Sequence, residues 1–268
     1  MGRRGKRGED HVKLLMERAI GMPVKAIAFD LIGTVVHVKP NREAMLKSLV
    51  EALKASGIRI GTEEFYDTYR RVNQRYMELR VNSLREFSNP LIVAETLDEL
   101  GHPVKPEDLT VVEAVKEYFK PYIESVYTTP GTRKVLTGLK NKYRLGIITN
   151  FTFPWTVNEC LKKTRLNNIF NPIVTSADVG WRKPHPLIFK TFAQAVGLAE
   201  ENIVFVGDDL KRDIYGAVKV GMKTILLCSG LTETEDAFYE QKIDEEVTAQ
   251  MEIKSLKELE YALKIFDP

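Results

Sequence analysis

Lys25-Ala26-Ile27-Ala28-Phe29-Asp30-Leu31-Ile32-Gly33-Thr34 is the stretch that decides the fold. An apolar run ends at Asp30, and Gly33 permits a tight turn just after it. A short apolar run that ends in polar turn residues is typical of a buried strand in a parallel α/β sheet. Ligands bind at the carboxyl ends of such strands, so Asp30 is placed for chemistry, although an Asp here can also simply cap a turn or a helix.

Similar apolar runs recur later in the chain. They span Leu145–Thr149, Ile203–Val206 before Gly207-Asp208, and Thr224–Cys228. Each is followed by a helix-like or turn-rich stretch, and strands that alternate with helices indicate parallel crossovers. We therefore predict an α/β core with a doubly wound parallel sheet.

Residues 41–126 have a different pattern, with helical periodicity and almost no strand signal. The apolar stripes predict helices that end near Gly57 and that cover Phe65–Leu79, Pro90–Leu100 after Ser88 and Asn89, and Pro106–Tyr122. We expect a helical bundle inserted into the sheet domain, directly after the strand that bears Asp30. It would lie over the carboxyl edge of the sheet and exclude water as a lid.

Composition restricts the class of protein. The 268 residues are 44% hydrophobic and 28% charged, which is typical of a soluble globular protein. No run approaches the roughly 20 apolar residues of a membrane helix, and no secretory signal is evident, so a cytoplasmic location is the default. Cys160 and Cys228 form no CxxC pair and suggest neither a disulfide framework nor a zinc site. Oligomeric state is open.

The N-terminal residues 1–22 form a basic extension, with a predicted helix over Glu9–Ile20 outside the core. A net charge of +2 makes nucleic acid an unlikely partner, and the local basic cluster is better explained as a solvated terminus; its members are Arg3, Arg4, Lys6 and Arg7.

Polar clusters lie at the strand ends or just beyond them. They are Asp30 to Thr34, Thr149-Asn150, Lys183 within Gly180-Trp-Arg-Lys-Pro184, and Gly207 to Asp213. A carboxylate, a hydroxyl, an ammonium and an acidic cluster are what aspartyl-phosphate chemistry needs.

Each cluster then has an expected role. Asp30 would attack phosphorus, Thr149 and the Asn150 backbone would hold phosphoryl oxygens, and Lys183 would neutralise charge. Asp208 and Asp213 would hold a hard cation, for which Mg²⁺ is suited. A helix predicted from Pro154 could direct its N-terminal dipole at the anion.

The order and spacing of these clusters resemble the four motifs of the haloacid dehalogenase (HAD) superfamily, from Lys25 to about Leu227. Connecting stretches also resemble it: Thr129-Pro-Gly131, Lys183-Pro-His-Pro-Leu-Ile-Phe189 and Gly216-Ala-Val-Lys-Val-Gly-Met222. The resemblance implies a Rossmann-like core at 23–40 and 127–268 and a type-1 helical cap at 41–126. It also implies that Asp30, Asp208, Asp213 and the backbone carbonyl of Ile32 bind the metal, and that the substrate is a small phosphorylated molecule.

One position departs from the family phosphatases, which usually carry a second Asp two residues after the nucleophile. This chain has Ile32 there, and a hydrocarbon cannot protonate a leaving alcohol. General acid–base help is worth about 10²–10⁴ in rate. We therefore expect poor turnover of unactivated esters.

The departure keeps other functions open. 2-Haloacid dehalogenases and phosphonoacetaldehyde hydrolases also have a non-acidic residue there, but Asp208 and Asp209 would repel a departing halide unless a cation neutralises them. Phosphonoacetaldehyde hydrolysis would need a cap lysine, whereas Lys47 and Lys54 are better explained as surface residues. A catalytically impaired protein that binds a phospholigand or a partner is a further alternative.

Other polar and aromatic residues have a functional and a structural interpretation. The favoured interpretation of Asp209 is a helix cap. His37 is better explained as a polar loop residue and His185 as a structural residue. Phe151 and Trp155 fit pocket and core equally well. The basic residues of the insertion could bind an acidic substrate, but solvated helix faces paired with Glu are commoner; these are Arg70, Arg71, Arg75, Arg80 and Arg85.

Overall fold

The computed structural model describes residues 22–231 and 247–266, and the predicted helix Glu9–Ile20 and the basic residues before it lie outside these ranges. The described residues contain a parallel sheet in the order β3-β2-β1-β4-β5-β6. Its strands are β1 (Ala26–Phe29), β2 (Arg144–Thr149), β3 (Ile173–Thr175), β4 (Ile203–Gly207), β5 (Lys223–Leu227) and β6 (Met251–Ile253). The prediction of a doubly wound α/β sheet is confirmed; β3 and β6 were not predicted.

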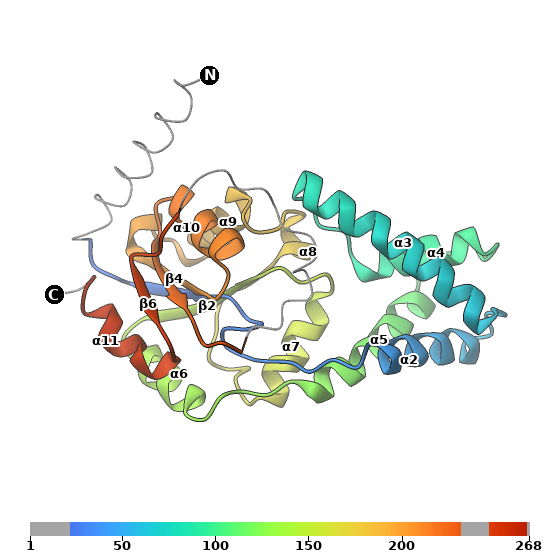
Figure 1. The fold of residues 1–268 in the computed structure, drawn as a ribbon, viewed down its shortest axis with the longest axis horizontal. Coiled ribbons are helices and arrows are strands. Elements are labelled where there is room, and N and C mark those ends of the chain that lie inside the picture. The colour runs from blue at the N-terminus through green and yellow to red at the C-terminus, as the bar shows by residue number, and fades with distance from the viewer. Residues whose placement is uncertain (1–21, 232–246, 267–268) are drawn as a thin grey trace, which may run out of the picture.

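Helices cover both faces of this sheet (Figure 1). Along β1, Ala26 and Ala28 pack on one side while Ile27 and Phe29 pack on the other. The first side is covered by α9 (Pro186–Val196) and α10 (Tyr215–Lys219), and the second by α6 (Thr132–Lys140), α7 (Pro154–Lys163) and α11 (Leu259–Leu263). The remaining short elements are α8 (Ser176–Val179), η1 (Glu200–Asn202), η2 (Leu210–Ile214) and η3 (Leu256–Glu258).

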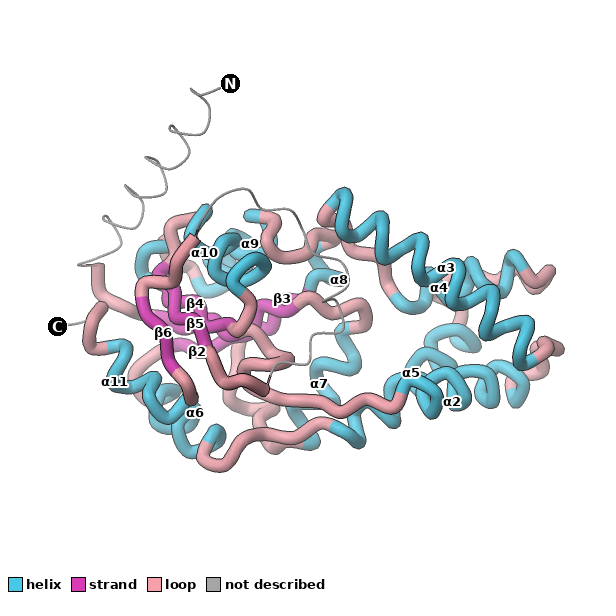
Figure 2. Tube along the Cα trace, in the orientation of Figure 1, coloured by secondary structure: helices cyan, strands magenta, loops and turns pink. Residues whose placement is uncertain are grey.

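Between β1 and β2 the chain forms the helices α2 (Arg42–Ala55), α3 (Thr62–Ser83), α4 (Asn89–Glu99) and α5 (Leu109–Ser125), which extend to one side of the sheet (Figure 2). We call residues 41–126 the insertion. Its helices overlap the predicted ones, and the side chains of Asn41 and Ser88 cap α2 and α4. No helix in the described ranges is long and apolar enough to cross a bilayer.

The predicted start of the last helix of the insertion is wrong. The periodicity placed it at Pro106, whereas α5 begins at Leu109. Asp108 Oδ2 accepts a hydrogen bond of 2.8 Å from Lys105 N. That bond closes a turn, so residues 105–108 precede the helix instead of forming its first turn.

The two connections between the insertion and the sheet run side by side. His37 N donates to Tyr127 O at 2.8 Å, and Tyr127 N donates to His37 O at 2.9 Å. This pairing fixes where the insertion leaves and re-enters the core, next to the carboxyl end of β1.

Candidate active site

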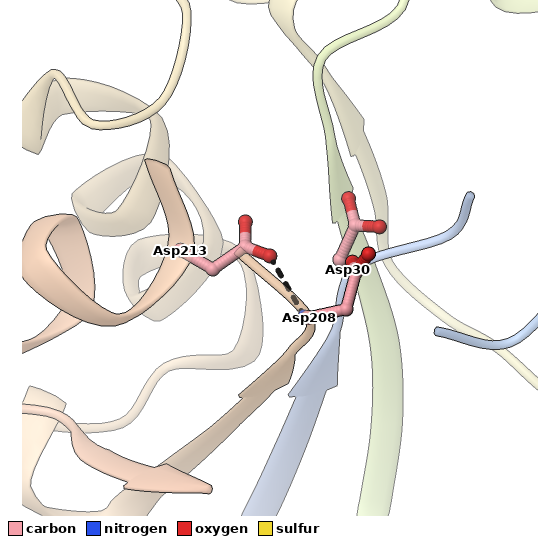
Figure 3. Close-up of side chains that lie close together, drawn as sticks. All are labelled: Asp30, Asp208 and Asp213. Atoms are coloured by element: carbon pink, nitrogen blue, oxygen red, sulfur yellow. Dashed lines mark hydrogen bonds between the residues drawn. The ribbon is translucent and has the colours of Figure 1, made fainter. Parts of the chain in front are cut away.

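Carboxylates of three Asp residues converge beyond the carboxyl edge of the sheet (Figure 3). Asp30 follows β1, Asp208 follows β4, and Asp213 lies on η2. Because β1 and β4 are parallel neighbours, their ends bring Asp30 and Asp208 together, and Asp30 N donates to Val206 O at 2.9 Å. One ligand oxygen from each of the three carboxylates lies within 4.8 Å of the others. The three carboxylates predicted from the sequence as metal ligands are thus close neighbours in space.

The η2 segment is a π-helical turn, a rare geometry that is frequent at functional sites. Asp213 Oδ2 accepts hydrogen bonds of 3.2 Å from the backbone N of Asp208 and of Asp209 (Figure 3 shows the first). Gly207 makes this approach possible, because a Cβ there would lie 2.3 Å from Asp213 Oδ2. The turn therefore holds Asp213 facing back toward Asp208.

Asp209 caps η2, as predicted. Its Oδ1 accepts from Lys211 N at 2.9 Å and from Arg212 N at 2.7 Å. Its Oδ2 accepts from Arg212 Nε at 2.8 Å. Because these bonds engage both carboxylate oxygens, the acidic trio of the site is Asp30, Asp208 and Asp213.

Lys183 lies between two of these carboxylates. Its Nζ is 2.5 Å from Asp30 Oδ1 and 2.6 Å from Asp213 Oδ1, and its side chain is only 3% exposed. Asn150 holds the Lys183 backbone at both ends, because Lys183 N donates to Asn150 Oδ1 at 2.7 Å and Asn150 Nδ2 donates to Lys183 O at 3.1 Å. The Asn150 side chain thus positions Lys183. Thr149, the last residue of β2, is buried and lines a cavity together with Lys183 and the three carboxylates.

Burial dominates the electrostatics of the trio. It raises the pKa of Asp30, against the opposing attraction of Lys183. Burial, and then repulsion by Asp213, raises the pKa of Asp208 to about 6; burial likewise raises the pKa of Asp213 to about 6, against the attraction of Lys183. Burial alone would lower the pKa of Lys183, but Asp213 and Asp30 outweigh it and the pKa is raised.

The trio fits a divalent cation. One ammonium does not balance three carboxylates, and repulsion between neighbouring carboxylates adds to burial in raising the pKa values of Asp208 and Asp213. Carboxylate oxygens are the ligands that Mg²⁺ and Ca²⁺ prefer, so a hard cation would supply the missing charge. Thr34 Oγ1 donates to Asp208 Oδ1 at 3.1 Å, which orients one of the carboxylates.

A cavity of about 1030 Å³ opens in front of the trio, between the insertion and the core. Ile32 lines it from the core, as do His37 and Phe151. From the insertion the lining includes Tyr66, Tyr69, Arg70, Asn73, Met77 and Tyr118. Among the described residues, Lys183 is the only lysine in this lining. Lys47 and Lys54 of α2 are exposed and do not line the cavity.

Most of the other residues singled out from the sequence have structural partners. His185 stacks on Trp181 with ring centroids 3.9 Å apart, and Arg85 lies over the same Trp ring at 4.2 Å. Burial lowers the pKa of His37, which favours the neutral form of the ring. Phe151 belongs to the core as well as to the cavity wall, and Trp155 packs partly buried against the core.

The basic residues of the insertion are mainly paired with acidic residues, as the sequence analysis favoured. Arg70 contacts Asp67, Arg71 contacts Glu99, and Arg75 contacts Glu95 and Glu99. Arg80 differs because it is buried and pairs with Glu86. Sequence reasoning missed Glu86 and its second partner Arg182, although Arg182 stands beside Lys183 in the motif.

Known proteins resemble this chain in sequence and in fold. The family model for haloacid dehalogenase-like hydrolases matches residues 24–221, and the chain belongs to that family. The chain is 31% identical over 240 residues to a glyceraldehyde 3-phosphate phosphatase of Pyrococcus furiosus, covering 88% of this chain and 94% of the relative.

Two solved structures share the fold. A HAD phosphatase from Thermococcus onnurineus has a TM-score of 0.55 and 23% identity, over 90% of this chain and 98% of the other. A 2-haloacid dehalogenase from Pseudomonas syringae pv. Tomato DC3000 has a TM-score of 0.60 and 19% identity, over 90% of this chain and 98% of the other. Because both activities occur on this fold, the choice between them depends on the site.

Proposed function

We propose that this protein is a Mg²⁺-dependent phosphatase that acts on a small phosphorylated molecule through an aspartyl-phosphate intermediate at Asp30. The observation that carries the proposal is Lys183 Nζ, 2.5 Å from Asp30 and 2.6 Å from Asp213, with Asp208 in the same cluster. This arrangement suits a dianionic phosphoryl group that needs a nucleophile and strong neutralisation. The phosphatase name of the Pyrococcus relative supports the same reading.

In the first half-reaction, a carboxylate oxygen of Asp30 attacks phosphorus, and the bond from phosphorus to the leaving oxygen breaks with its electron pair on that oxygen. Lys183 neutralises charge on the phosphoryl group, and the Thr149 hydroxyl and the Asn150 backbone amide bind its other oxygens. In the second half-reaction, water attacks phosphorus, the Asp30 carboxylate leaves, and orthophosphate is released.

The metal would be held by the carboxylates of Asp30, Asp208 and Asp213 and by the backbone carbonyl of Ile32. When bound, Mg²⁺ supplies positive charge for the phosphoryl oxygens and offsets the repulsion among the carboxylates. The raised pKa values of Asp208 and Asp213 support this placement, because both groups gain from a neighbouring cation.

Ile32 determines which substrates turn over well. It lines the cavity but has no ionisable proton to donate, so the leaving oxygen takes its proton from water. Esters with acidic leaving groups lose least from this deficit. We therefore expect p-nitrophenyl phosphate and acetyl phosphate to be better substrates than alkyl phosphates.

We assign residues 41–126 as the cap domain, residues 23–40 and 127–268 as the catalytic core, and residues 1–22 as an appended extension. The cavity between the insertion and the core supports this division, since it has walls from both. The insertion would exclude water from the phosphoryl group when a substrate fills the cavity. Its tyrosines and polar side chains would select the rest of the substrate.

A 2-haloacid dehalogenase is the second candidate, and Ile32 is the observation that favours it, because halide departure needs no proton. The acidic trio opposes it, since the buried carboxylates repel a departing anion.

The deciding assay compares p-nitrophenyl phosphate, acetyl phosphate, glyceraldehyde 3-phosphate and 2-chloropropionate, each with Mg²⁺ and with EDTA, using Asp30→Asn as the control. Release of phosphate that needs both Mg²⁺ and Asp30 supports the proposal. Metal-independent chloride release would support the dehalogenase instead. Ligand-induced stabilisation without hydrolysis of any substrate would indicate a phospholigand-binding protein.

A further inference from the structure

The loop between α3 and α4 carries a buried carboxylate, Glu86, whose side chain is 1% exposed. Its Oε1 accepts from Arg80 Nε at 2.9 Å and from Phe87 N at 2.9 Å. Its Oε2 accepts from Arg182 Nη1 at 2.7 Å and from the hydroxyl of Ser176. We call Arg80, Glu86, Ser176 and Arg182 the Glu86 cluster; two of its members come from the insertion and two from the core.

The backbone around this cluster also joins the insertion to the core. Glu86 N donates to Gly180 O at 3.1 Å, and Arg182 N donates to Leu84 O at 2.8 Å. The Arg85 guanidinium covers the Trp181 ring at 4.2 Å. The segment of the core that precedes Lys183 is therefore bound to the insertion along its length.

The Glu86 cluster is connected to Lys183 along two routes. The first route is Arg182, which immediately precedes Lys183 in the chain. The second route is Asn150, because Phe151 N donates to Ser176 Oγ at 2.9 Å and Phe151 follows Asn150. Asn150 in turn binds the backbone N and O of Lys183. A single carboxylate thus joins both supports of the Lys183 backbone.

Burying an ionic cluster costs desolvation free energy, and apolar packing of similar volume is often as stable or more so. Charged groups instead fix the geometry, because a carboxylate that accepts from several donors has few possible arrangements. We propose that Glu86 is a positioning residue, which holds the insertion against the segment before Lys183 and thereby fixes the Lys183 ammonium between Asp30 and Asp213. The proposal rests on the proposed function for the role of Lys183.

The test uses Glu86→Gln, which preserves shape and removes the charge, and Arg182→Lys as a milder second variant that keeps the charge but loses the guanidinium fork. Glu78→Gln is the matched control, because Glu78 is exposed on α3 and accepts a hydrogen bond from another exposed residue of the same helix, Gln74. Turnover of p-nitrophenyl phosphate with Mg²⁺ is measured for each variant in the wild-type background and in a Lys183→Met background.

We expect Glu86→Gln and Arg182→Lys to lower kcat by about tenfold or more in the wild-type background. If Glu86 acts through Lys183, Glu86→Gln should lower the residual kcat of Lys183→Met by less than about twofold, because coupled residues are not additive. Glu78→Gln should change neither. An equal loss in both backgrounds, or no loss in either, would overturn the proposal.

Hydrogen exchange gives a readout that does not need catalysis. Exchange of the backbone amides of Arg182 and Lys183 should accelerate by about tenfold or more in Glu86→Gln and stay unchanged in Glu78→Gln. Unchanged exchange in Glu86→Gln would overturn the proposal. If the wild type hydrolyses no phosphate ester, the proposed function fails by itself, and faster exchange would still support the positioning of the segment that bears Lys183.

Discussion

Replacing Lys183 by Met should reveal how strongly the acidic trio depends on its one buried ammonium. The Nζ lies within 2.6 Å of an oxygen of Asp30 and of Asp213, and solvent does not reach it. Removing one partner of a buried ion pair typically costs about 3–5 kcal/mol, because the remaining charge is left uncompensated. For a chain of this length that loss lowers the melting temperature by roughly 10 °C.

The cost should depend on pH and on metal. At pH 7.5 without Mg²⁺, Asp208 and Asp213 are largely ionised and the full loss is expected. At pH 5 it should shrink, because Asp208 and Asp213, with pKa values of about 6, take up protons and no longer need the ammonium. Adding Mg²⁺ at pH 7.5 should restore part of the stability by replacing one positive charge with another.

Thermal unfolding followed by circular dichroism at both pH values, with Mg²⁺ or EDTA, measures these effects. Lys190→Met is the matched control, since Lys190 is exposed on α9 and should unfold like the wild type. If Lys183→Met is as stable as the wild type at pH 7.5 in EDTA, or is destabilised equally at pH 5, our account of the buried charges is refuted.

The other predictions concern the metal, the nucleophile and position 32. The pKa values of Asp208 and Asp213 are raised from 3.8 to about 6 in the folded protein. In the metal-free protein, the contribution of this pair to the free energy of unfolding is therefore fully present below pH 4 and is lost as pH rises through 6. Stabilisation by Mg²⁺ needs the ionised forms and should grow over the same window; calorimetry that finds it constant from pH 5 to 7.5 would contradict the site. Asp30→Asn should abolish phosphate release from p-nitrophenyl phosphate, and retained turnover in a steady-state assay would exclude Asp30 as the nucleophile. Ile32→Asp should accelerate hydrolysis of alkyl phosphates by about 10²–10⁴ and of acetyl phosphate much less, as the ratio of kcat/KM values would report.

Much of the fold follows from local patterns. The runs at β1, β2, β4 and β5 are long enough to be recognised as buried strands, and the helices of the insertion have clear apolar stripes. β3 and β6 contain only three residues each, so they are too short for a period to be visible, and their pairing is determined by neighbours in the sheet. The start of α5 was misplaced because proline is tolerated in a first helical turn, whereas the bond from Lys105 to Asp108 is a side-chain detail.

The acidic trio and Lys183 could be proposed from sequence because each follows a strand or lies in a recognisable motif, and the carboxyl ends of parallel strands share one edge. The cap of η2 by Asp209 was also predictable from residue type. Glu86 could not be found in this way. It is one of 37 acidic residues, lies in a loop without periodicity, and is important only because folding brings it to Arg182 and Ser176, about 90 residues away.

The central claim, that Asp30 accepts the phosphoryl group, is tested most directly by acid-quenching the enzyme during turnover of acetyl phosphate with Mg²⁺ and mapping the phosphorylated peptide by mass spectrometry. We predict that the phosphoryl group is found on Asp30 and that it accumulates, because Ile32 gives the attacking water no base. Phosphorylation of a different residue, or turnover with no phosphorylated peptide at any time point, would contradict the account.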